Sequence, residues 1–177
     1  RNNLVTCNTH GCGELTMLCV ESNELSTLDL STNRSLTELY AAKNVLGKAD
    51  IAGLSQLSIC ELYDNQIERI KLDGCTSLSE LYLHNNRIAY LSTWHCESLH
   101  QLDCRNNLLK SLDLSNNVLM SFLFATENPL MMKLFINEQS DYNTISVDEN
   151  VEVLYKYPGA FDDVSGDWGD DDIDPWK

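Results

Sequence analysis

Residues 78–88 read LSELYLHNNRI, and this stretch decides the fold because its aliphatic positions and its second asparagine recur at fixed offsets. The asparagine returns every 21 residues through most of the chain, at Asn2, Asn23, Asn44, Asn65, Asn86, Asn107 and Asn128. A strict period of about 20 to 50 residues indicates an array of stacked units, each too small to fold alone. The chain is therefore predicted to be a repeat solenoid.

Aliphatic residues fill the other fixed columns of the repeat. The first column holds Leu15, Leu36, Leu57, Leu78, Leu99 and Met120, and the second holds Leu18, Leu39, Cys60, Leu81, Leu102 and Leu123. The short L-x-L segments alternate as half-buried strands do, and the second half of each unit also reads as extended chain without helical periodicity. We therefore expect strands on both sides of a flat, gently curved solenoid with little or no helix.

These columns resemble the leucine-rich repeat family, whose signature is L-x-x-L-x-L-x-x-N-x-L. The unit is most similar to the short nested bacterial class of 21 residues, in which both halves carry the pattern. The resemblance implies a right-handed solenoid with a parallel β-sheet. We expect residues 1–157 to form about seven 21-residue turns.

The ladder asparagines are predicted to point inward, where their amides can satisfy backbone groups that would otherwise be buried unpaired. This structural set comprises Asn23, Asn44, Asn65, Asn86, Asn107 and Asn128. The phase slips by one residue near Pro129, since 145–150 lies 22 residues after 123–128. A bulged connection is expected there.

Residues 158–177 differ from the repeats in containing seven aspartates and two tryptophans. The favoured interpretation is an acidic cap over the last turn, because terminal turns of repeat arrays need a polar outer face. An unstructured acidic tail is the alternative. Calcium binding has little support, because the segment lacks the glycine and glutamate of an EF-hand loop.

Composition excludes several classes of function. The net charge of −15 would repel nucleic acid, and no apolar run is long enough to span a membrane. The seven cysteines mostly occupy buried columns and are expected to be thiols. No catalytic motif occurs, and His95, Cys96 and His100 supply fewer than the four ligands of a zinc site. We expect no enzyme activity, no metal and no cofactor.

The outward positions of the first-half strands should line the concave face. Aromatic side chains near an arginine are typical of binding hot spots, so this face is the predicted partner site. Its candidate residues are Tyr40, Glu61, Tyr63, Tyr82, His84, Asp103, Arg105, Phe122 and Phe124. Alternatively, these side chains only cover the sheet or pack against a second copy of the chain.

The sequence thus favours a protein-binding or ligand-binding module, and the resemblance suggests a secreted or surface protein of a bacterium. The chain starts in mid-repeat and shows no signal segment. Two alternatives stay open: an acidic inhibitor or immunity protein that neutralises a basic enzyme, and a structural segment of a larger adhesin. The partner and the oligomeric state are left open.

Overall fold

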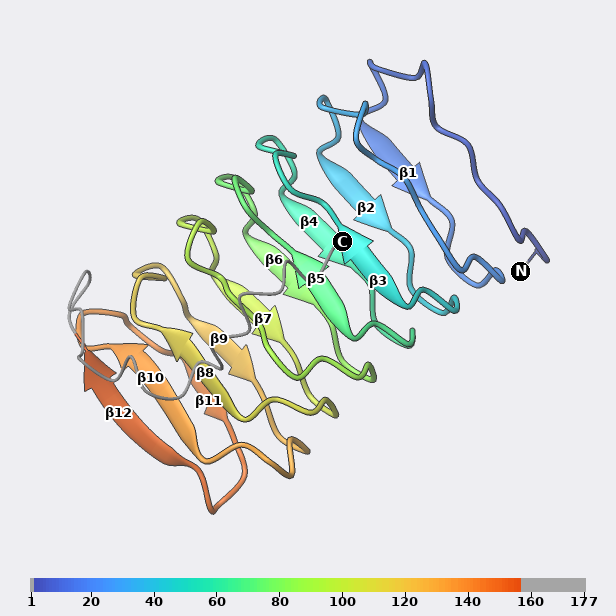
Figure 1. The fold of residues 1–177 in the computed structure, drawn as a ribbon. Helices are drawn as coiled ribbons and strands as arrows, with labels where there is room; N and C mark the ends of the chain where they lie inside the picture. Colours follow the sequence, from blue (N-terminus) through green and yellow to red (C-terminus); the bar gives the residue numbers. More distant parts are fainter. Residues whose placement is uncertain (1, 157–177) are drawn as a thin grey trace, which may run out of the picture.

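The computed structural model describes residues 2–156 and shows a coil of stacked turns, with a short strand on one or both sides of most turns (Figure 1). One parallel sheet contains seven strands, in the order β1 (Met17–Cys19), β2 (Glu38–Tyr40), β4 (Ile59–Glu61), β6 (Glu80–Tyr82), β7 (Gln101–Asp103), β9 (Phe122–Phe124) and β11 (Thr144–Ser146). Within residues 2–156 there is no helix, and therefore none that could cross a membrane. The expected leucine-rich-repeat-like solenoid of parallel strands is confirmed.

The other side of the turns carries two smaller parallel sheets. β3 (Lys48–Asp50) pairs with β5 (Arg69–Lys71), and β10 (Lys133–Asn137) lies between β8 (Ser111–Leu114) and β12 (Glu152–Lys156). Residues 90–92, in the turn between β5 and β8, form no strand. The back of the solenoid is therefore interrupted beside Thr93, which stands where the neighbouring turns have Leu72 and Leu114.

The hydrophobic core fills the space between the two sides. The inner strands of the seven-stranded sheet turn their central residues inward, and Leu39, Leu81 and Leu102 are fully buried, whereas Ile145 in the edge strand β11 is exposed. The second-half columns close the core from the opposite side with Ile67 and Leu109. A single turn buries too few aliphatic side chains to offset the entropy of ordering 21 residues, so its stability comes from its neighbours.

Strand register locates the irregular turn. Glu80 pairs with Gln101, an offset of 21 residues, whereas Phe122 pairs with Thr144 and Ser111 pairs with Lys133, both offsets of 22. Asn128 still accepts a hydrogen bond from the Leu109 amide, 19 residues earlier, as the other ladder asparagines do. The extra residue therefore lies between Asn128 and Lys133, next to Pro129 as expected.

Each ladder asparagine joins two turns, as Asn86 illustrates. Its Nδ2 donates to the carbonyl oxygens of Leu83 in its own turn (2.9 Å) and of Leu62 in the preceding turn (3.0 Å). Its Oδ1 accepts a hydrogen bond from the Ile67 amide at 2.9 Å. One side chain thereby satisfies three backbone groups inside a tight bend, which no aliphatic residue could do.

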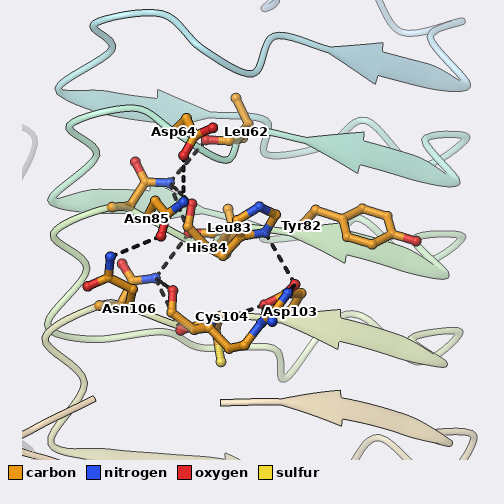
Figure 2. A network of polar contacts seen from close by, with 12 residues as sticks. Leu62, Asp64, Tyr82, Leu83, His84, Asn85, Asp103, Cys104 and Asn106 are labelled. Atoms are coloured by element: carbon orange, nitrogen blue, oxygen red, sulfur yellow. Dashed lines mark hydrogen bonds and ion pairs between the residues drawn. The ribbon is translucent and has the colours of Figure 1, made fainter. Parts of the chain in front are cut away.

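The residue before each ladder asparagine has a left-handed backbone. Six such residues, none of them glycine, have φ between 50° and 61°: Ser22, Lys43, Asp64, Asn85, Asn106 and Glu127. Three of their side chains form an exposed row, in which Asn106 donates to Asn85 (2.9 Å) and Asn85 donates to Asp64 (2.6 Å; Figure 2). We call this column of six residues the rim.

All seven cysteines are free, and four of them (Cys60, Cys75, Cys96 and Cys104) are buried. Burial raises the pKa of the Cys75 thiol to about 11 and that of the Cys96 thiol to about 12. Such thiols stay protonated near neutral pH and pack as small apolar groups. The cap, tail and calcium hypotheses for 158–177 fall outside the described residues.

Candidate functional site

The nine candidate residues lie together on the outer surface of the seven-stranded sheet, which we call the seven-stranded face. Strand register places Glu61 of β4 between Tyr40 of β2 and Tyr82 of β6. Tyr82 is followed by Asp103 of β7 and then by Phe124 of β9. These residues stack in one column because the same position of each successive turn lies one strand further along the sheet, at a spacing of ~4.8 Å.

A second column runs beside this one, just beyond the strand ends. The Tyr63 and His84 rings stack with their centroids 4.5 Å apart and their planes 7° apart. The His84 Nδ1 lies 3.2 Å from a carboxylate oxygen of Asp103, as Figure 2 shows. Asp103 also receives two hydrogen bonds from Arg105, at 2.9 and 2.6 Å.

Cations lie near the rings at both ends of this column. The Lys43 ammonium is 5.3 Å from the centroid of the Tyr63 ring and also pairs with Glu21 at 2.9 Å. The Arg105 guanidinium carbon is 5.5 Å from the centroid of the Phe124 ring. A continuous series of contacts therefore connects five turns, from Lys43 through Tyr63, His84, Asp103 and Arg105 to Phe124.

Tyrosine–glutamate pairs occupy the other edge of the face. The Tyr40 hydroxyl donates to Glu38 at 2.7 Å, and the Tyr82 hydroxyl donates to Glu80 at 2.8 Å. The hydrogen bond to Glu38 raises the pKa of Tyr40 to about 12, and burial together with Glu80 raises that of Tyr82 to about 12. Both phenols are therefore neutral hydrogen-bond donors at physiological pH.

Exposure on this face differs from the sequence expectation. Tyr40, Tyr63, Tyr82, Phe122 and Phe124 were expected to be left in water, but all five are half-buried. They lean on side chains of the adjacent strands, as the His100–Phe122 ring contact at 5.4 Å illustrates. Asp103 is only 4% exposed, because His84 and Arg105 cover it. The 21-residue period could not predict this burial. It determines which side of the sheet a residue faces but not which neighbouring side chains it contacts.

Lys43 was missed among the candidate residues. It belongs to the rim, where the sequence shows only a variable residue before each ladder asparagine. The sequence could have identified it, because Lys43 lies 21 residues before Asp64 and Asp64 directly follows the outward residue Tyr63. Lys43 must therefore lie near Tyr63, one turn away. A lysine at that place can reach both the ring and the Glu21 carboxylate.

A separate pocket of about 240 Å³ lies on the back, at the interruption between β5 and β8. Tyr90 and Trp94 line it with 60% and 52% of their surfaces exposed, together with Asp113 and Asn117. No candidate residue lies here. Among residues 2–156, no group of three histidine, cysteine or carboxylate side chains is arranged to hold a metal ion.

The fold is similar to a known solenoid. A structure of the functional domain of InlJ from Listeria monocytogenes, which includes a cysteine ladder, superposes with a TM-score of 0.52 at 22% identity. The alignment covers 89% of this chain and 42% of that one, so this chain spans less than half of its length. No protein-family model and no curated protein matches the chain. The similarity supports the solenoid fold.

Proposed function

We propose that this domain is a protein-binding module whose partner docks on the seven-stranded face. The observation that supports this most strongly is the row of cross-strand contacts from Lys43 to Phe124, which holds aromatic and charged side chains against one another in one continuous surface. A surface ordered before binding loses little entropy when a partner docks. Aromatic side chains and arginine are also the types that contribute most to protein interfaces.

The setting we propose is the surface or exterior of a bacterium, as the resemblance suggested. No catalytic constellation was found in the sequence, so recognition rather than catalysis is the proposed role. The ligand would be a protein segment, because a broad and nearly flat surface suits a polypeptide better than a small molecule.

Affinity capture tests this function. The full chain is compared with a variant in which Tyr40, Tyr82 and Phe124 are replaced by alanine. A second triple variant, with alanine at Tyr90, Trp94 and Tyr155, is the control because it removes three aromatics from elsewhere on the solenoid. The partner should be lost from the first variant and kept by the second. Equal recovery by both, with both variants folded, would show that this face is not the binding site.

One observation also favours an acidic inhibitor or immunity protein. The seven-stranded face carries five carboxylates against two basic side chains, Lys43 and Arg105; the carboxylates are those of Glu21, Glu38, Glu61, Glu80 and Asp103. Such a field accelerates association with a basic enzyme and makes the rate depend steeply on salt. The test is the association rate of a captured enzyme between low and high salt, together with its activity in the complex. A salt-independent rate or an unaffected activity argues against inhibition.

A further inference from the structure

The middle of the seven-stranded face holds a carboxylate without a partner of its own. Glu61 lies between Tyr40 and Tyr82, but both phenols donate to other carboxylates, those of Glu38 and Glu80. Within residues 2–156, no hydrogen bond or ion pair reaches the Glu61 side chain. The nearby Lys43 ammonium is held by Glu21 at 2.9 Å.

The surroundings of Glu61 disfavour its negative charge. Partial burial raises its pKa, and the carboxylates of Glu21 and Glu80 add to that effect. The opposing influence of Lys43 does not cancel it. A cation placed over Glu61 would relieve this repulsion, so the electrostatic complement of the site is a positive charge.

The rings of the same face already contact cations. Lys43 lies over Tyr63, and Arg105 lies over Phe124. Each cation comes from an end of the face, and the Tyr40 and Tyr82 rings beside Glu61 have no such contact in residues 2–156. A hydroxyl that donates to a carboxylate also makes its ring richer in electrons, which strengthens attraction for a cation over that ring.

We propose that the centre of the seven-stranded face, with Glu61 between Tyr40 and Tyr82, receives a lysine or arginine side chain from a basic segment of the partner protein. This rests on the proposed function of the face and adds the chemistry of its partner. Charge complementarity selects this occupant, because an acidic segment would meet five carboxylates and a purely apolar one would leave Glu61 buried and unpaired.

The spacing of the carboxylates sets the spacing of the basic residues. Glu38 and Glu80 lie in the same column two strands apart, a separation of ~9.6 Å at the usual strand spacing. A peptide in the polyproline II conformation has about three residues per turn and rises ~3.1 Å per residue, so every third side chain points the same way at intervals of ~9.3 Å. A basic residue at every third position therefore matches the face.

Three peptides of equal length test the proposal: three repeats of Lys-Ser-Ser, of Glu-Ser-Ser and of Leu-Ser-Ser. Each is titrated into the 177-residue protein while amide resonances are followed by NMR. Residue-level detection is needed because the aspartates of 158–177 also attract lysine. The lysine peptide should shift the resonances of β2, β4 and β6, and the other two peptides should leave them unchanged.

A matched pair of variants gives the decisive comparison. Glu61→Gln should weaken the lysine-peptide binding at β2, β4 and β6 by about threefold to tenfold. Glu68→Gln makes the same change of charge at an exposed residue just before β5, on the back of the solenoid, and should leave that binding unchanged.

Two results would overturn the proposal. One is equal lysine-peptide affinity of the two variants, and the other is stronger binding of the leucine or glutamate peptide to the face. Failure of the proposed function is distinguishable from either. If a captured partner is lost with the Tyr40, Tyr82 and Phe124 variant but binds Glu61→Gln normally, the face binds protein and only the basic partner is wrong.

Discussion

Asn85 and Asn86 are adjacent residues with opposite roles, and comparing them isolates the energy of the ladder. Asn86 is buried and bonds three backbone groups, so Asn86→Ala should cost ~1–3 kcal/mol by leaving those groups unpaired. Asn85 is exposed and left-handed, so Asn85→Gly removes its side chain without strain and should change stability by less than ~0.5 kcal/mol. Urea unfolding of both variants measures the difference. An equal loss of unfolding free energy in the two variants would refute the structural role of the ladder asparagine.

Glu61 provides a prediction about pH. Its pKa is raised above the ordinary value of 4.5, so the folded state holds the proton more tightly than the unfolded chain does. The protonated Glu61 side chain therefore contributes favourably to the free energy of unfolding. This contribution is fully present below pH 4.5 and is lost as the pH rises through the folded-state pKa. Glu61→Gln should therefore be more stable than the parent at pH 7, and this gain should shrink towards pH 4.

Denaturant unfolding at the two pH values checks this, with Glu68→Gln as the control for the change in net charge. The interpretation would be wrong if Glu61→Gln were less stable than the parent at pH 7. It would also be wrong if its gain were the same at both pH values.

At the scale of an element, two glycines of the same turn, Gly47 and Gly53, make different demands. Gly53 has φ of 73°, and a methyl group there would collide with the Arg34 guanidinium, which bonds the Ala52 carbonyl oxygen. Gly47 has open space around it and no positive φ. Gly53→Ala should therefore cost more than ~1 kcal/mol, whereas Gly47→Ala should stabilise by ~0.4–1 kcal/mol. Thermal unfolding of both variants tests this, and a shift in the same direction would contradict it.

The strands show how far sequence reasoning reached. The 21-residue columns predicted which residue of β2, β4, β6, β7 and β9 turns inward, and the extra residue near Pro129 followed from the same count. The interruption at 90–92 was foreshadowed only by Ser92 and Thr93. The length of the interruption depends on whether the backbones of neighbouring turns form strand pairs along the back. The sequence of a single turn does not determine that pairing.

The candidate face was predictable by position and not by contact. A repeat places Tyr63, His84 and Asp103 on one surface, because outward positions recur with the turn. Stacking of the rings and the pairing of Asp103 with Arg105 depend on side-chain rotamers and on neighbours one turn away. These contacts make the aromatics half-buried, which the column pattern alone could not indicate.

For the whole molecule, the repeat predicts that complete turns can be removed. Deleting residues 66–86 takes out 21 residues and joins Asn65 to Arg87 in the same phase. The shortened chain should fold, with a lower free energy of unfolding and a smaller urea m-value, because stability in such arrays is nearly a sum over turns. Circular dichroism and urea unfolding report both quantities.

The control deletion removes residues 66–76, about half of a turn, because the 22-residue offset after Pro129 shows that the array accommodates one extra residue. The strands that follow are then moved from one side of the solenoid to the other, so their aliphatic columns no longer align with those of the preceding turns. This variant should fail to fold cooperatively. Similar unfolding curves for the two deletions would show that phase does not control the array.

The divided back of the solenoid has a mechanical consequence. The seven-stranded sheet is continuous, whereas the back is hydrogen-bonded as separate blocks on either side of residues 90–92. Resistance to bending is lowest where only one of two layers is continuous, so the molecule should flex at the turn that contains Tyr82 and His84. Flexing there would change the curvature of the seven-stranded face near its centre, so the two halves could adjust their mutual angle to the shape of the partner that we propose docks on it.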